Sequence, residues 1–515
     1  MRPSGLPSAV NRLSFHVRPF HASFAPAKTP DVFANSLRQT LAAHRSSNRA
    51  RLIRKIVPRT DRPDIFRPEI PPECRADYQP RLEPTLPTPT PEQSQIANPL
   101  SKRHQRRLRR SSSSGVSRIP KDRPAGHAIQ SADTINGRPE QQPWLRELGP
   151  FQTNGDGSTH LDAEIRALEH YLVPSSREQE QIDRLRVEVT SFVEAVVPHT
   201  PQVIGSRGTG LALAHSNLDF LLPFEDLPRS LDRVRRPSAT RPQIRDAHTD
   251  LLRQVGFALR RSTAFDNFVH RHGKHGPMLT VRHRPTGLNL SFSCGEGVPA
   301  LTEYLRDYQA EYPALRPLYV ATRTLLEARG LFGAPKSSIG PDALAILLVA
   351  FLKMNHGRFS GYHRLGDQLL ALLQLYGTGI NLQDVGVAGD PPGFFTTETL
   401  RSVPDVDEPA YCRGQRSLIS AKRTAAAKGN LPAARRPCIQ DPTHYMNDLG
   451  RSCTRTPELQ RALAAAYEQL CLACKNWAND SENMPSILTT ALQANFEPLE
   501  NLRAQIMCPT RRNPS

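Results

Sequence analysis

The chain has 515 residues, 38% of them hydrophobic, and a formal net charge of +18. This length suits two or three domains, and the absence of any run of about 18 apolar residues excludes a membrane span. The eight cysteines are scattered without a paired framework, which favours a reducing compartment over secretion. Residues 1–140 carry 25 Lys and Arg against 11 Asp and Glu, so most of the net positive charge lies in the N-terminal quarter.

The N-terminus has the composition of a mitochondrial transit peptide. Residues 1–30 contain Arg2, Arg12, Arg18 and Lys28 and no acidic residue, and their serines are interspersed with Leu, Val and Phe. Transit peptides are rich in Arg and Ser and poor in acids, whereas secretory signals have a continuous apolar stretch. We therefore expect residues 1–30 to direct the protein to the mitochondrial matrix. The alternative is an ordinary basic, disordered end.

Residues 31–157 are predicted to form a disordered basic arm. Its sequence is rich in Pro, Arg and Ser from about residue 56, and such a segment cannot bury enough apolar surface to offset its ordering entropy. Six cations lie within nine residues: Lys102, Arg103, Arg106, Arg107, Arg109 and Arg110. A run of this kind attracts RNA phosphates through counterion release. A solvated linker or a localisation tag would have the same composition, and both alternatives stay open.

Ordered structure is predicted to begin near Leu161. Apolar residues at helical spacing predict helices over 161–174 and 176–198, each ended by a proline. Ser175 and Ser176 followed by Glu178 predict an N-terminal cap of the second helix. Four short runs with strand character follow, at 201–206, 217–224, 278–284 and 288–293.

The second half of the chain is predicted to be helical. The pattern is helical from about 300 to 376, and a loop rich in Ala, Lys, Arg and Pro over about 404–436 precedes a final helix at 456–478. Cys471 and Cys474 in that helix are predicted to be half-buried cysteines rather than zinc ligands, because a tetrahedral site needs four ligands. The order of elements predicts a small α/β domain followed by a helical domain.

Residues 203–224 have the pattern of a phosphate- and metal-binding site. A strand leads into Gly205-Ser206 and a glycine-rich turn, and a second strand presents Asn217 and Asp219 on one face because side chains alternate along a strand. Backbone N–H groups of such a turn can approach a phosphate, and Ser206 can bond a terminal phosphate oxygen. Two acids at this spacing would hold the pair of Mg²⁺ ions used in phosphoryl transfer, but only Asp219 is acidic.

Five segments in the same order resemble the noncanonical poly(A) polymerases and terminal uridylyltransferases of the DNA polymerase β superfamily. They are the leading "LDAEIRALEHYLVPSSREQE", the "GS" with "SNLDF" and "TGLNLSFS", the helix "ALRPLYVATRTLLEARGL", the pair "SIGPDALAILLVAFL" and "LGDQLLALLQLYG", and the loop "CIQDPTHYMNDLGRS". The resemblance implies an α/β nucleotidyltransferase palm, a mixed sheet flanked by helices, over 158–300. It also implies a mostly α-helical poly(A)-polymerase-associated domain over 301–480 with a nucleotide-recognition loop at 438–452. Residues 481–515 would form a C-terminal tail.

Carried over position by position, the resemblance implies site residues and shows that several are altered. The family's three acidic metal ligands match Asn217, Asp219 and Asn289, so two carboxylates are amides here. The expected nucleotide-binding residues are Gly205, Ser206, Arg323, Asn447 and Asp448. On the family's phosphate-gripping helix, Glu327 stands in place of the second basic residue. Gly340-Pro341-Asp342 replaces Gly-Ser-Tyr, whose Tyr stacks on the base.

These substitutions predict a weakened catalytic site. Asn offers one neutral carbonyl oxygen where Asp offers a charge and two acceptor oxygens. Unit charges about 4 Å apart interact by about 4 kcal/mol at an effective dielectric near 20, so losing two carboxylates weakens metal binding by several kcal/mol. Asn289 also removes the carboxylate best placed as base or metal bridge for the attacking 3′-hydroxyl, and Glu327 adds a negative charge near the expected triphosphate.

The sequence thus predicts a mitochondrial RNA-processing protein of this family that is a pseudoenzyme and acts by binding RNA, a nucleotide or a protein partner, without a cofactor. One alternative is an active, template-independent RNA 3′ adenylyltransferase that uses Mg²⁺ or Mn²⁺. ATP is the favoured NTP in that case because Met446 rather than His precedes Asn447. The other alternative is a structural subunit of a mitochondrial complex, since a fold outlasts the loss of its active site.

Overall fold

The computed structural model describes residues 128–131, 142–148, 156–223, 241–273, 276–295, 297–333, 338–359, 364–401, 409–480 and 486–509. All of them belong to one compact unit, residues 61–515. The predicted transit peptide and the six cations between residues 102 and 110 lie outside the described residues. None of the helices within the described ranges has both the length and the apolar run needed to cross a bilayer.

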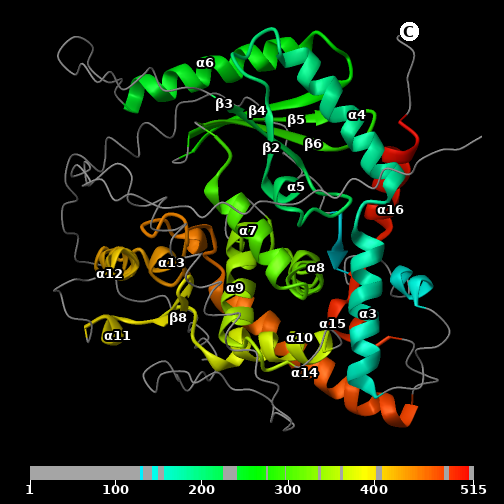
Figure 1. Ribbon diagram of the computed structural model, residues 1–515, viewed down its shortest axis with the longest axis vertical. Helices are drawn as coiled ribbons and strands as arrows, with labels where there is room; N and C mark the ends of the chain where they lie inside the picture. The colour runs from blue at the N-terminus through cyan, green and yellow to red at the C-terminus, as the bar shows by residue number, and fades with distance from the viewer. Residues whose placement is uncertain are drawn as a thin grey trace, which may run out of the picture. The chain divides into compact units, whose positions relative to one another are not determined.

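The α/β part is a mixed five-stranded sheet with the order β2-β3-β6-β5-β4 (Figure 1). Its strands are β2 (Gln202–Ile204), β3 (Leu218–Pro223), β4 (Phe265–Gly273), β5 (Gly276–His283) and β6 (Asn289–Gly295). Strands β3 and β6 are parallel, and the other neighbours are antiparallel. Four of these strands were predicted from the sequence. The fifth, β4, contains a register shift with Asn267 at φ 51°, which breaks the regular alternation of a strand.

Helices α4 (Ser176–Val193) and α6 (Arg241–Arg260) cover one face of this sheet (Figure 1). Alternate strand residues such as Phe220, Phe292 and Leu279 are buried in the core they share. The predicted cap of α4 is confirmed, because Ser175 Oγ accepts from the Glu178 N–H and the Glu178 carboxylate accepts from the Ser175 N–H. On the opposite face of the sheet, Asp219, Thr280 and Ser291 are partly buried and Arg282 is exposed.

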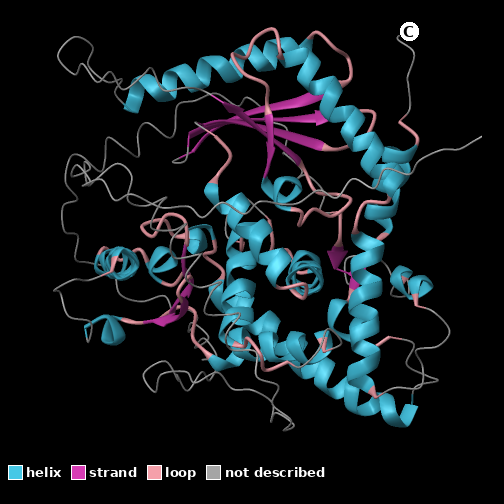
Figure 2. Cartoon of the chain, viewed as in Figure 1, coloured by secondary structure: helices cyan, strands magenta, loops and turns pink. Residues whose placement is uncertain are grey.

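The larger part is helical (Figure 2), and it combines α3 (Gly157–Leu172), which precedes the sheet in the chain, with helices that follow the sheet. Its helices are α3, α7 (Ala300–Glu311), α8 (Leu315–Ala328), α9 (Pro341–Met354), α10 (Leu365–Gln374), the π-helical turn η4 (Leu375–Gly379) and α14 (Thr456–Asp480). They share one apolar core. Helix α9 is buried on nearly all sides, as its continuous run from Ala343 to Leu352 predicts.

A three-stranded sheet with the order β8-β7-β9 carries the predicted nucleotide-recognition loop. The elements around it are β7 (Gly386–Gly389), β8 (Pro392–Phe395), α11 (Thr397–Arg401), α12 (Ala410–Ala427), α13 (Leu431–Ala434), β9 (Cys438–Gln440) and η5 (Leu449–Ser452). The prediction of a loop over about 404–436 is wrong, because α12 and α13 lie there. Leu418 and Ile419 of α12 are buried against this sheet, so a narrow apolar stripe was enough to anchor a helix rich in cations.

Two segments predicted to be unstructured contribute to the fold. Within the predicted arm, β1 (Gln130–Ser131) pairs with β10 (Ala494–Asn495), and the turn η3 (Pro143–Glu147) buries Trp144. Within the predicted C-terminal tail lie α15 (Leu488–Leu492) and α16 (Glu497–Met507). In both segments a few large apolar side chains in an otherwise polar sequence account for the structure that was not predicted.

Helix α16 connects the tail to the palm. Arg503 makes a bidentate ion pair with Glu178 of α4 at 2.8 Å, and Ile506 is buried in the palm core.

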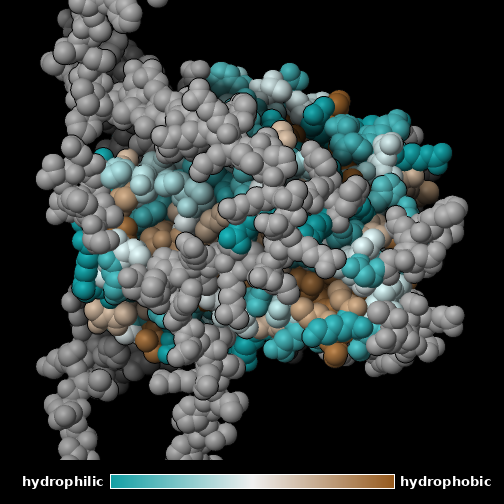
Figure 3. Space-filling model, turned by 60° about the horizontal axis from the view of Figure 1, so that its bottom comes forward, coloured by the Kyte–Doolittle hydropathy of each residue, from teal (hydrophilic) through white to brown (hydrophobic). Residues whose placement is uncertain are grey.

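In Figure 3 the described surface that this view exposes is mostly hydrophilic with scattered hydrophobic residues.

Candidate functional site

The sheet brings the three predicted metal-ligand positions together. Asn217 directly precedes β3, Asp219 is its second residue, and Asn289 begins β6. The parallel register pairs Asp219 with Ser291 and Leu218 with Leu290, which places Asn217 level with Asn289. Neighbouring strands lie about 4.8 Å apart, so the three side chains share one small area of the polar sheet face.

Asp219 is held closely by its surroundings. Its Oδ1 atom accepts a hydrogen bond from the Ser291 hydroxyl, and a Cβ added at Gly205 would lie 2.4 Å from its Oδ2 atom. Gly205 has φ +65°, a conformation that favours glycine, and Ser206 follows it at the start of α5 (Gly205–Thr209). Burial raises the pKa of Asp219, while the Ser291 hydrogen bond and the charge of Arg207 lower it by less.

Arg207 lies under the loop that leads to Asn217. Its Nη2 donates to the Ser216 carbonyl at 2.7 Å and its Nε to the Asn217 carbonyl at 3.2 Å. Burial lowers the pKa of Arg207 to about 10 and the charge of Asp219 opposes that shift, so the group remains a cation at neutral pH. The sequence analysis did not identify Arg207, although its place directly after Gly205-Ser206 was a usable signal.

A second arginine lies beside the third ligand position. Arg282 of β5 is the direct antiparallel neighbour of Asn289 on β6. It is exposed, and its register partner on the other side is Asp266 of β4, whose carboxylate pairs with Arg284 at 2.8 Å. Sequence reasoning missed Arg282, because only the register between the two strands reveals that it faces Asn289.

Arg323, predicted to grip a triphosphate, is buried in an internal cluster instead. Its Nε contacts the Glu327 carboxylate at 3.3 Å, its Nη1 donates to Ser216 Oγ at 3.2 Å, and its Nη2 contacts His215 Nε2 at 3.2 Å. Glu327 also contacts His215 at 2.8 Å. Each nitrogen of the Arg323 guanidinium therefore has a protein partner, and this geometry points to a structural task.

The charge of Glu327 is compensated within the same cluster. Burial alone would raise its pKa, but His215 and Arg323 outweigh that effect and hold the pKa at about 2. The expectation that Glu327 repels a triphosphate is therefore corrected. Its carboxylate neutralises Arg323, the basic residue at the expected phosphate-gripping position.

The predicted base-recognition residues lie in a loop braced by its own hydrogen bonds. Asp448 Oδ1 accepts from the N–H groups of Ile439 at 3.1 Å and Gly450 at 2.9 Å. Asn447 Nδ2 donates to Asp441 Oδ2 at 2.9 Å. Asp448 is buried and shapes the loop, whereas Asn447 keeps its side-chain carbonyl for another donor. Contact of either residue with a base stays a prediction.

Asp342 stands where the family has its stacking Tyr. It is exposed, yet surrounding protein raises its pKa to about 6, and the negative charges of Asp441 and Asp219 add to that shift. Asp342 thus lies within electrostatic reach of both the palm and the recognition loop. The predicted phosphate and base positions therefore border one common site.

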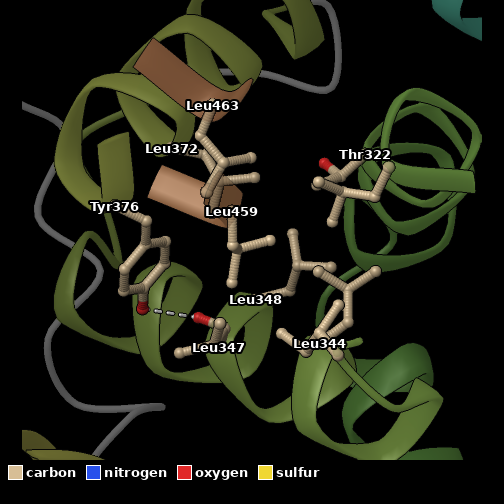
Figure 4. Close-up of a pocket in the computed structure, with 10 residues that line it drawn as sticks. Thr322, Leu344, Leu347, Leu348, Leu372, Tyr376, Leu459 and Leu463 are labelled. Carbon is tan, nitrogen blue, oxygen red and sulfur yellow. Dashed lines mark hydrogen bonds between the residues drawn. The ribbon is translucent and has the colours of Figure 1, made fainter. Parts of the chain in front are cut away.

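A separate cavity lies within the helical core and has no part in this site (Figure 4). Leucines such as Leu344, Leu348 and Leu459 line it, and Tyr376 Oη donates to the Leu347 carbonyl at 2.8 Å. Its apolar lining, drawn from α8, α9, α10 and α14, is that of a gap in core packing.

No family model matches the chain. Among curated proteins it is 23% identical to the Poly(A) RNA polymerase protein 1 of Eremothecium gossypii, over 68% of this chain and 51% of that protein. It is 24% identical to the Saccharomyces cerevisiae protein of the same name, over 67% of this chain and 48% of that one. The chain's homologues are poly(A) RNA polymerases. It spans about half of the length of these two poly(A) RNA polymerases.

Solved structures show the fold to be that of the poly(A) polymerase nucleotidyltransferases. The polymerase core of TRAMP, a RNA surveillance complex, matches with a TM-score of 0.54 at 18% identity, over 68% of this chain and 99% of that one. A mutant mtPAP in complex with ATPγS matches with a TM-score of 0.50 at 14% identity, over 70% of this chain and 78% of that one. The predicted fold class is confirmed.

Poly(A) polymerases use divalent metal ions, but the donor set found here does not fit a pair of them. The three ligand positions supply one carboxylate, and one of its oxygens already accepts from Ser291. Within the described ranges, no three His, Cys, Asp or Glu side chains gather closely enough to hold a metal ion. Two hard divalent ions prefer several charged oxygen ligands. The remnant of the site offers amides and nearby arginines instead.

Proposed function

We propose that this protein is an RNA-binding relative of the poly(A) polymerases whose transferase activity is lost or strongly reduced, and that it acts in mitochondrial RNA processing. One observation carries the loss of activity: of the three metal-ligand positions only Asp219 is acidic, with amides at Asn217 and Asn289. The burial of Arg323 with Glu327 supports it, since the helix then offers no free cation for a triphosphate.

Primer extension tests the proposal. The full-length protein is mixed with a labelled RNA oligomer, each NTP in turn, and Mg²⁺ or Mn²⁺. We expect no extension beyond that of an Asp219→Ala variant, which controls for contaminating polymerase. Extension that disappears in Asp219→Ala would instead identify an active enzyme, and the same gel would report its preferred nucleotide.

Active adenylyl transfer is the second candidate, and the names of the relatives favour it. The double variant Asn217→Asp/Asn289→Asp separates the two candidates. If the amides caused the loss of activity, the variant should gain metal-dependent extension. An active wild-type protein would show extension before any substitution.

The composition of residues 1–30 supports the mitochondrial location. A fluorescent fusion of the full chain should co-localise with mitochondria, and deletion of residues 1–30 should disperse it. An unchanged distribution after the deletion would remove the location from the proposal.

A further inference from the structure

Two arginine side chains lie near the remnant of the catalytic site, where the family has metal ions. Arg207 holds the carbonyls of Ser216 and Asn217, just before Asp219, and Arg282 is opposed to Asn289 across the strand pair. In a complete two-metal site, three carboxylates and two divalent ions leave one net positive charge. Asp219 with these two arginines carries the same net charge, and the ion pair of Asp266 with Arg284 beside Arg282 adds none. The two arginines thus supply positive charge on the palm side of the site without the ions.

We propose that this site binds a phosphate group directly, without a divalent cation, and that its ligand is the phosphate chain of a nucleotide. The inference rests on the proposed loss of transferase activity and goes further, since it names the ligand and the residues that receive it. Arginine suits this task because its planar guanidinium bonds phosphate oxygens in pairs and always carries its charge.

The register places Arg282 where it can reach such a ligand. Directly opposed residues of an antiparallel pair have Cβ atoms about 5 Å apart, so the longer arginine side chain extends past Asn289. Thr280 and Ser291 are opposed on the next pair of the same face, and both are only partly buried. The sheet face therefore offers a free cation next to neutral hydroxyl groups.

Arg207 supplies the second charge from α5, whose first residue lies beside Asp219. Its Nε and Nη2 hold the loop carbonyls, while within the described part of the chain its Nη1 makes no hydrogen bond. Its loop contacts fix the guanidinium in place, so little conformational entropy is lost when an anion binds.

Negative charge on the helical side limits where the phosphate can lie. Asp342 on α9 lies close enough to Asp441 of the recognition loop and to Asp219 of the palm for their charges to raise its pKa. A phosphate would be repelled there and attracted toward Arg282 on the palm. The base of a nucleotide would then lie toward the loop, as in the orientation implied by the family resemblance.

Calorimetric titration of the full-length protein with ATP in EDTA, and again in Mg²⁺, tests the proposal. We expect binding in EDTA with an affinity equal to or higher than in Mg²⁺. Arg282→Ala should weaken ATP binding in EDTA about tenfold to hundredfold, as loss of a charge-assisted hydrogen bond predicts, and Arg282→Lys should recover part of the lost affinity. Binding that needs Mg²⁺, or no binding in EDTA, would overturn the proposal.

Arg253→Ala is the matched control. Arg253 is 62% exposed on α6, on the covered side of the sheet, so its loss changes net charge equally without touching the site. Equal effects of the two substitutions would show nonspecific attraction and overturn the proposal. Arg282 is exposed, so its variants should melt at the wild-type temperature.

A short RNA oligomer in EDTA distinguishes the two sources of phosphate. If RNA binds in an Arg282-dependent manner and ATP does not, the site takes a backbone phosphate and the assignment to a nucleotide is wrong. Primer extension remains a separate measurement. If the protein extends RNA and binds ATP only with Mg²⁺, both the loss of activity and the metal-independent site are contradicted. If it does not extend RNA but still binds ATP only with Mg²⁺, the metal-independent site alone is contradicted.

Discussion

Gly205, directly after β2, lies so close to Asp219 of β3 that a Cβ added at Gly205 would lie 2.4 Å from Asp219 Oδ2. The register pairs Asp219 with Ile204, which brings the start of the glycine-rich turn over the carboxylate. The position of the one remaining acid therefore depends on the absence of a side chain at residue 205.

Gly205→Ala should destabilise the protein by about 2 kcal/mol or more, because the left-handed backbone and the contact with Asp219 both disfavour a side chain. Urea unfolding measures the change. Gly330→Ala is the control, since Gly330 has a similar φ of +61° but nothing within 4 Å of an added Cβ. Equal losses in both variants would show that the contact with Asp219 has no energetic weight.

Asn217→Asp/Asn289→Asp should create a metal site. With three carboxylates, Mn²⁺ affinity should rise by at least about tenfold, because each added charge interacts with the ion by several kcal/mol. Calorimetry and a Mn²⁺-dependent rise in melting temperature would report the gain in Mn²⁺ affinity. The same variant carrying Asp219→Ala should lose most of the gain. A double variant that binds Mn²⁺ no better than wild type would contradict the assignment of these positions.

Glu327→Gln should destabilise the protein by about 3 kcal/mol at pH 7, because Arg323 and His215 would lose their buried counter-charge. The pKa of Glu327 is depressed from 4.5 to about 2 in the folded protein. Its stabilising contribution is therefore complete above pH 4.5 and disappears as the pH falls toward 2.

The gap in unfolding free energy between wild type and Glu327→Gln should accordingly narrow on acidification. Glu180→Gln is the control, because Glu180 is a 60% exposed acid on α4 whose surface ion pair contributes little. A gap that stays constant from pH 7 to pH 3 would contradict the role given to Glu327.

Asp342→Asn should strengthen ATP binding at pH 8 by about twofold to fivefold, the range of an exposed charge interaction. The pKa of Asp342 is raised to about 6, so its carboxylate is charged and repels phosphate above that pH and is neutral below it. Titrations at pH 8 and pH 5 should show the advantage of the variant only at pH 8. Weaker binding of the variant at pH 8 would mean that Asp342 contacts the ligand favourably.

Replacing the six cations between residues 102 and 110 with Gln should weaken RNA binding at low salt. For single-stranded RNA, the slope of log K against log salt is about −0.7 per phosphate neutralised, so it should become less negative by up to about 4. Filter binding over a range of salt concentrations measures it. Replacing the four arginines of α6 with Gln should change the slope less for each charge removed. An unchanged slope in the arm variant would remove the arm from RNA binding.

Much of the palm could be predicted because its signals are local. The cap of α4 needs only Ser175 and Glu178, and strand β3 follows from apolar residues alternating around Asp219. Helix α12 could not be predicted in this way. Its buried stripe is narrow, and its abundance of Ala, Arg and Lys resembles a surface loop until β9 is seen to pack against it.

The residue types of the site follow from the sequence, whereas the surroundings of each residue follow from the tertiary structure. The sequence alone determined that amides occupy two of the three positions that the family resemblance assigns to metal ligands, because that statement needs only residue types at matched positions. Only the tertiary structure decided that Glu327 is paired with Arg323 and His215, and that Arg282 lies beside Asn289. Charges act through space over distances that strand register and helix packing set, and residues 282 and 289 meet because β5 turns back on β6.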